Sequence, residues 1–233
     1  MFIINLQYAY LLLCAEFLIV WALIYTYSPL TRHEQIRMSL VSIPGGPLSE
    51  LLYFRDYWYP QSAFPIRIGP IHTVVEDMLF AFAFAGIVVA FYPFVMRWRL
   101  RSNPALSGGV RIAAIVVALT SFFFIWIGVN SIFATSIGFL AAAAWMVARR
   151  PGLGWSALWS GVLASLTMFT MYLVGYHIIA NSEELLAGVW LLHQTIWGER
   201  RVAGIPVTEL IWAFSFGTLF GPLYAFGRRK YYV

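Results

Sequence analysis

The fold is decided by the stretch Val74-Val75-Glu76-Asp77-Met78-Leu79-Phe80-Ala81-Phe82-Ala83-Phe84. A similar stretch follows later in the chain, as Pro206-Val207-Thr208-Glu209-Leu210-Ile211-Trp212-Ala213-Phe214-Ser215-Phe216. At this offset of 132 residues, Asp77 aligns with Glu209 and Phe80 aligns with Trp212. Each copy begins with an acid, continues as an apolar run and ends at a basic cluster. The pattern indicates one acid-led apolar helix that is present twice.

Apolar residues dominate the whole chain. Of its 233 residues, 61% belong to the AVILMFWYC set and only 11% are charged, against roughly 25% charged residues in soluble domains. Such a chain is neither disordered nor an ordinary soluble domain. Its net charge of +5 comes from short basic clusters beside apolar runs and does not indicate nucleic-acid binding. We therefore expect an integral membrane protein whose first partner is the lipid bilayer.

The apolar runs predict the membrane spans. A helix that crosses a bilayer needs roughly 20 apolar residues, and six runs qualify or come close: 2–27, 71–96, 112–129, 132–147, 156–180 and 205–226. A seventh run, 38–54, is interrupted by Gly45-Gly46-Pro47, as a discontinuous helix would be. The short run 187–197 suits an interfacial or re-entrant segment. The first run lacks the basic region of a signal peptide, so we expect a retained anchor.

The basic clusters predict the orientation. Cytoplasmic loops are enriched in Lys and Arg, which places residues 97–101, 149–150 and 228–230 inside. If Arg32 and Arg37 also lie inside, the run 38–54 must cross and the chain has seven transmembrane helices. If it does not cross, the chain has six. We favour seven, in a multi-pass protein of the cell membrane with a cytoplasmic C-terminus.

The chain divides into two similar parts around the acid-led helices. Ser49-Glu50-Leu51-Leu52 faintly resembles Ser182-Glu183-Glu184-Leu185-Leu186, upstream of the second copy. The sequence thus predicts an all-α integral membrane protein of about seven transmembrane helices, built as two parallel three-helix repeats. The repeats are residues 1–97 and 132–233, and a linking helix lies in residues 98–131. Parallel repeats commonly place a site between the halves.

Carboxyl groups inside the apolar runs are the candidate catalytic residues, because ionisable groups are costly in a membrane. Glu76 and Asp77 are neighbours, and two close carboxyls resist being ionised together, which leaves one as an acid and the other as a base. Glu209 takes the matching place in the second copy. Glu50 is a further candidate. Glu16 is a lone acid in the first run and receives no role.

Other side chains complete the candidate site. His72 lies four residues before Glu76, on the same face of a helix, and Thr208 stands beside Glu209. With Phe80 and Trp212, they are the expected substrate contacts, since aromatic faces can stabilise a cation. The structural alternative is that the acids cap helix N-termini and that the aromatic residues are lipid-facing bulk.

Motifs for metals and cofactors are absent from the sequence. The single cysteine, Cys14, excludes an internal disulfide and a cysteine metal cluster. The chain has no glycine-rich dinucleotide fingerprint after a strand, no P-loop and no His-Glu-x-x-His motif. We therefore expect neither a metal nor a cofactor.

The acid-led motif pair resembles the membrane lycopene cyclases of the heterodimeric or fused type, in which a Pro-x-Glu-Glu/Asp helix occurs twice. Gly46-Pro47-Leu48-Ser49-Glu50 and Asp56-Tyr57-Trp58-Tyr59-Pro60 are also similar to segments of bacterial lycopene-cyclase-domain proteins. The resemblance covers most of the chain. This chain departs from the motif at Val74, where the family has proline, and at Thr208, where it usually has its first acid.

The resemblance implies an acid/base reaction without net redox change. An acid protonates the terminal double bond of a linear carotene, an internal double bond closes a ring, and a base removes a proton. Glu76 and Asp77 would be the acid/base pair for one end group, Glu209 a second site or a proton relay, and Glu50 an auxiliary acid. A linear carotenoid or another isoprenoid would be the substrate.

Other functions remain open from sequence. An isoprenoid hydratase would use the same acids, with water capturing the cation. A non-enzymatic isoprenoid-binding protein or a proton-coupled carrier would also need buried acids in an apolar chain. A homo-oligomer is compatible with each of these functions.

Overall fold

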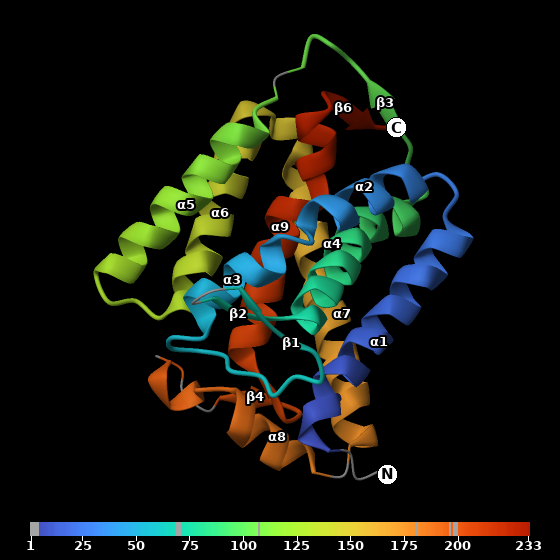
Figure 1. Cartoon of the computed structure of the whole chain (residues 1–233). Coiled ribbons are helices and arrows are strands. Elements are labelled where there is room, and N and C mark those ends of the chain that lie inside the picture. The colour runs from blue at the N-terminus through green and yellow to red at the C-terminus, as the bar shows by residue number, and fades with distance from the viewer. Residues whose placement is uncertain (1–4, 69–70, 107, 180, 196, 198–199) are drawn as a thin grey trace.

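The computed structural model describes residues 5–68, 71–106, 108–179, 181–195, 197 and 200–233 (Figure 1). Its α-helices are α1 (Leu6–Tyr27), α2 (Arg32–Ser42), α3 (Gly45–Tyr53), α4 (Val75–Met96), α5 (Val110–Trp126), α6 (Ser131–Arg149), α7 (Gly154–Ile178), α8 (Ser182–Val189) and α9 (Val207–Gly227). Short 3-10 turns, η1 (Pro151–Leu153) and η2 (Leu192–Gln194), precede α7 and follow α8. Helices α1, α4, α6, α7 and α9 are long and apolar enough to cross a membrane, and α5 is a shorter apolar helix. The predicted all-α membrane fold is confirmed.

The broken run 38–54 is divided between two short helices. Helix α2 ends at Ser42 and α3 begins at Gly45, so the helix is interrupted beside Pro44. Together, α2 and α3 lead the chain back from the end of the bundle where α1 finishes to the end where α4 begins (Figure 1). Helices α1 and α4 therefore run in the same direction (Figure 1). The count of seven passes stays a prediction, because α2 and α3 are not among the helices that are long and apolar enough to cross a membrane.

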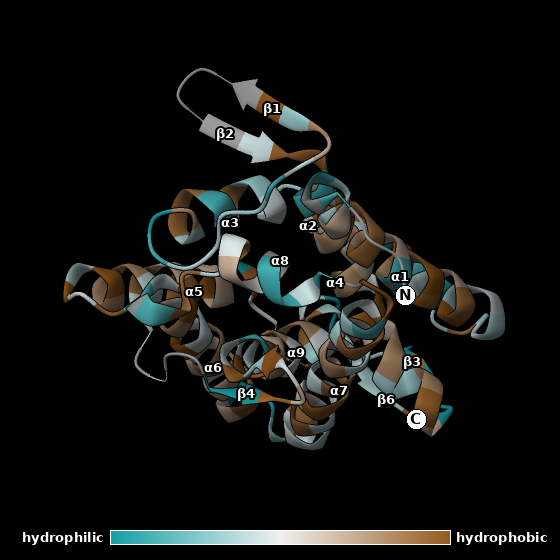
Figure 2. Ribbon diagram, turned by 90° about the horizontal axis from the view of Figure 1, so that it is seen from below, coloured by the Kyte–Doolittle hydropathy of each residue, from teal (hydrophilic) through white to brown (hydrophobic). Residues whose placement is uncertain are grey.

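Both acid-led helices begin later than the apolar runs predicted, because each follows a short hairpin. Strands β1 (Pro65–Ile68) and β2 (Ile71–Val74) pair before α4, and β4 (Arg201–Val202) and β5 (Ile205–Pro206) pair before α9. Seen from the end that holds α8, the β1–β2 hairpin projects from the side of the bundle (Figure 2). The expectation that His72 shares a helical face with Glu76 is therefore wrong, since His72 lies in β2 opposite Arg67.

Contacts between the halves join residues that are 132 apart, which is the offset of the sequence repeat. Trp58 and Trp190 form an antiparallel bridge, and the rings of Phe84 and Phe216 are 5.3 Å apart. Strand β3 (Leu100–Ser102) pairs with β6 (Lys230–Tyr232) so that Leu100 lies opposite Tyr232. When a residue contacts its own equivalent in the other half, the contact lies on the approximate twofold axis that relates the two halves. Here this axis runs along the contact between α4 and α9. The division at residues 97, 98, 131 and 132 stays a prediction.

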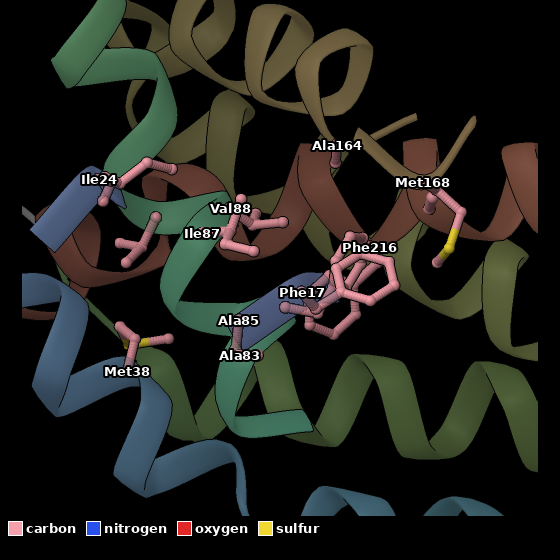
Figure 3. Close-up of a cluster of buried hydrophobic side chains, with 14 of the residues drawn as sticks. Phe17, Ile24, Met38, Ala83, Ala85, Ile87, Val88, Ala164, Met168 and Phe216 are labelled. Carbon is pink, nitrogen blue, oxygen red and sulfur yellow. The ribbon is translucent and has the colours of Figure 1, made fainter. Parts of the chain in front are cut away.

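Small residues let the main helices pack closely. A Cβ added at Gly217 of α9 would lie 2.5 Å from the Ser160 carbonyl oxygen of α7, so only glycine fits this crossing. Around it, a cluster that includes Phe17, Ala83, Met168 and Phe216 forms the core between α1, α4, α7 and α9 (Figure 3). Outward side chains are apolar too, as on α5, where Trp126 is 82% exposed. Such a surface suits a lipid environment.

Candidate functional site

A cavity of about 1360 Å³ lies between the two halves. Asp77, near the start of α4, and Glu209, near the start of α9, line the same cavity. Its wall is otherwise mainly apolar and comes from α2 and α3 in the first half, from α5, and from α6 and α9 in the second half. The two acids that the repeat aligns therefore face one shared space, as expected for a site between parallel repeats.

Aromatic rings line the cavity beside the acids. Phe80 and Trp212, the equivalent residues of α4 and α9, have ring centroids 6.2 Å apart. The indole of Trp212 donates a hydrogen bond of 2.8 Å to the Tyr53 hydroxyl, which fixes its orientation. The two aromatic residues among the predicted substrate contacts thus line the cavity, where their faces can stabilise a positive charge.

The Asp77 carboxyl interacts more strongly with Glu50 than with its sequence neighbour Glu76. The Tyr10 hydroxyl donates to Asp77 Oδ1, and the Glu50 carboxyl lies close enough to that of Asp77 to interact with it. Glu50 Oε1 accepts from the Val74 backbone N–H at 2.9 Å. Asp77 Oδ2 and Glu50 Oε2 are buried and accept from no donor in the described part of the chain. Two carboxyl groups that interact in a buried site resist being ionised together, so this pair is suited to hold a proton and act as an acid.

Glu209 has a different environment, because donors surround it. Tyr57 and Trp190 donate to Oε1 at 2.6 and 2.8 Å, and the Tyr172 hydroxyl donates to Oε2 at 3.1 Å. Burial, together with the charge of Glu209, raises the pKa of the Tyr57 phenol well above its usual value, so Tyr57 remains a donor. These three donors offset part of the cost of burying a carboxylate. Glu209 is therefore suited to act as a base.

Glu76 lies outside the cavity lining. Its carboxylate, which is fully buried, accepts from the Ser62 hydroxyl at 2.7 Å, from the Ala63 N–H at 2.8 Å and from the Phe64 N–H at 3.3 Å. These bonds hold the segment that leads into β1 against the first turn of α4. The placement of Glu76 indicates a structural role instead of the predicted catalytic one.

We expect Glu76→Gln to lower stability while leaving the chemistry of the cavity intact. The neutral amide replaces one acceptor oxygen and weakens the bonds to the 62–64 segment, a loss of about 1–2 kcal/mol in the free energy of unfolding. Thermal unfolding in detergent measures the stability, and product formed per folded molecule measures the chemistry. A fall in product per folded molecule of about 100-fold would instead show that Glu76 is a catalytic residue.

Gly46 brings α3 close enough for Glu50 to reach Asp77. A Cβ at Gly46 would lie 2.6 Å from the carbonyl carbon and oxygen of Asp77, which backbone atoms cannot accommodate without a shift. We expect Gly46→Ala to displace the first turn of α4 and to reduce activity about tenfold or more, since small misplacements are costly in catalysis. Gly45→Ala is the matched control, because an added Cβ there meets nothing within 4 Å. Equal activity of the two variants would contradict this role for Gly46.

The remaining predicted residues occupy varied positions. Thr208 is buried beside the site, and its hydroxyl is hydrogen-bonded to that of Tyr57 at 2.8 Å, so it orients a partner of Glu209. The side chain of His72 lies outside the described part of the structure. Glu16 lies in α1 against Gly175 of α7, and its buried oxygens have no partner in the described part of the chain.

Sequence reasoning missed the four side chains that donate to Asp77 and Glu209, namely Tyr10, Tyr57, Tyr172 and Trp190. The chain has 13 tyrosines and 10 tryptophans, so residue type alone selects none of them. Trp190 could have been found by extending the repeat, because it aligns with Trp58 at the same offset. The other donors have no such signal.

The cavity opens sideways between α2–α3 and α5. Leu48 and Leu51 of α3 and Phe122 of α5 line the cavity and are also exposed, by 61%, 54% and 62%. An apolar rim of this kind gives a molecule dissolved in the bilayer a route to the acids. Water-soluble substrates would find no comparable polar route along this rim.

The chain matches no family model, no curated protein and no solved structure. Function is therefore inferred from the cavity and its acids. In the described residues, no group of three or more His, Cys, Asp or Glu side chains could hold a metal ion.

Proposed function

We propose that this protein is a membrane enzyme that cyclises the end group of a linear carotene or a related isoprenoid. The observation that carries the proposal is that Asp77, the partner of the buried Glu50, and Glu209, which is surrounded by donors, both line one apolar cavity with an opening at its side. The resemblance of the acid-led helices to membrane lycopene cyclases supports the same chemistry.

The proposed reaction begins at the proton shared by Asp77 and Glu50. This proton moves to the terminal double bond of the substrate and leaves a cation at the adjacent carbon. An internal double bond attacks that cation, closes a six-membered ring and moves the charge into the ring. The Glu209 carboxylate then removes a ring proton and restores a double bond. The substrate gains and loses one proton, and no oxidant is needed.

The walls of the cavity suit this sequence of steps. Trp212 and Phe80 present aromatic faces to the cation, and the apolar lining beside them offers few hydrogen-bond partners to water that would capture it. The two equivalent acids have different partners, because Asp77 faces a carboxyl and Glu209 faces three donors. This difference supports Asp77 as the group that gives the proton and Glu209 as the group that takes it.

Pigment analysis in a lycopene-producing host tests the proposal. Expression of the full chain should convert lycopene to one-ring or two-ring carotenes, separated and identified by chromatography and mass. Hydroxylated acyclic products would indicate a hydratase instead. Unchanged lycopene, despite good membrane expression, would contradict the proposed enzyme and leave a binding or carrier function.

We also propose that the membrane is the cell membrane and that the basic end of the bundle, defined by Arg97, Arg149 and Arg228, is cytoplasmic. The positive-inside rule supports this orientation. A reporter fused after Val233 that is active only in the cytoplasm would test it.

A further inference from the structure

The cavity reaches the basic end of the bundle. Its lining includes Arg37 of α2 and Arg228, which follows α9, and both side chains are exposed. Between this end and the acids, α5 lines the cavity from Val110 to Ile125, which corresponds to about 22 Å of helix. The cavity is thus a long apolar slot with carboxyl groups towards one end and guanidinium groups at the other.

The positive charge at the basic end is not neutralised by the protein in the part that the structure describes. Glu34 is the nearby carboxylate of α2, and it is buried and paired with Lys230 at 3.4 Å. Neither Arg37 nor Arg228 takes part in an ion pair between described residues. His33 packs on Tyr224, and Arg229 donates to the Pro104 carbonyl oxygen. The mouth of the slot therefore has unmatched positive charge.

We infer that the slot binds an anionic phospholipid of the surrounding membrane, with its phosphate between Arg37 and Arg228 and one acyl chain along α5. Guanidinium groups bind phosphate through paired N–H donors, and basic pockets between helices hold anionic head groups. The mainly apolar lining from Ala114 to Phe122 matches an acyl chain.

The side opening favours a lipid over a free anion. Leu40 and Val41 of α2 are 55% and 74% exposed, line the slot and follow closely after Arg37. A lipid can therefore slide its chain in from the bilayer while its head group stays at the level of the arginines. This binding does not depend on the proposed cyclisation, although a bound chain would occupy the slot that a substrate needs.

Lipid titration of the purified full chain in maltoside detergent tests the inference. Native mass spectrometry should show dioleoylphosphatidylglycerol bound roughly tenfold more tightly than dioleoylphosphatidylcholine, since each basic residue near an anionic head group contributes substantially to binding. The variant Arg37→Gln/Arg228→Gln should lose this preference. Arg111→Gln is the matched control, because Arg111 is an exposed arginine at the same end that does not line the slot.

Two further measurements separate the head group from the chain. Ala114→Trp, which fills the slot, should weaken binding of both lipids, and inorganic phosphate alone should not raise the thermal unfolding temperature. Equal binding of the two lipids to the wild-type chain, or an equal loss of preference in Arg111→Gln, would overturn the inference. Full stabilisation by inorganic phosphate would overturn it too, because the site would then bind a free anion.

Discussion

Asp77→Asn should reduce formation of cyclic carotenes by at least about 100-fold, the usual contribution of a positioned general acid. Asparagine keeps the shape of the side chain and can still accept from the Tyr10 hydroxyl. It cannot share a transferable proton with Glu50, so the terminal double bond is not protonated. Carotene analysis in the lycopene-producing host measures the loss.

The control for this prediction is Glu184→Gln, an isosteric change at an exposed acid of α8. It should leave product levels unchanged. Immunoblotting of membranes and thermal unfolding would show that Asp77→Asn still folds. If the folded Asp77→Asn variant made normal amounts of product, Asp77 would be a helix cap and the proposed acid would be wrong.

The sequence predicted the spans well because their signal is local. Length and apolarity identify α1, α4, α6, α7 and α9 without knowledge of their neighbours. Helix starts were less predictable, since β2 and β5 begin with isoleucine and continue directly into the apolar helices that follow them. Only the pairing of each strand with its hairpin partner separates strand from helix there.

The candidate site was predictable where the repeat supplied a second copy. Asp77 and Glu209 were found together because they align, and they do line one cavity. The partner of Asp77 was not predictable, because Glu50 comes from another helix, which Gly46 lets approach the backbone of Asp77. Because Glu76 is adjacent to Asp77 in sequence, the sequence favoured Glu76 as its partner. Neighbouring residues of a helix point in directions about 100° apart, however, so the two side chains face different surroundings.

Glu209→Gln should reduce one-ring and two-ring carotenes together, also by about 100-fold. Glutamine keeps an acceptor for Tyr57 and Trp190 but cannot take up the ring proton at a useful rate. Because the structure places Asp77 and Glu209 on one cavity, both groups act on every end group, and the loss cannot be confined to the second ring.

The double variant Asp77→Asn/Glu209→Gln sharpens this distinction, since residues that act as a unit have non-additive effects. Its product level should lie within about threefold of the weaker single variant. If the two ends of the substrate were instead cyclised at separate sites, Glu209→Gln would leave one-ring carotene at the wild-type level. In the double variant, the losses of product caused by the two single changes would then multiply. Product ratios from the four proteins, measured at equal membrane expression, therefore decide whether the halves form one acid/base site or two.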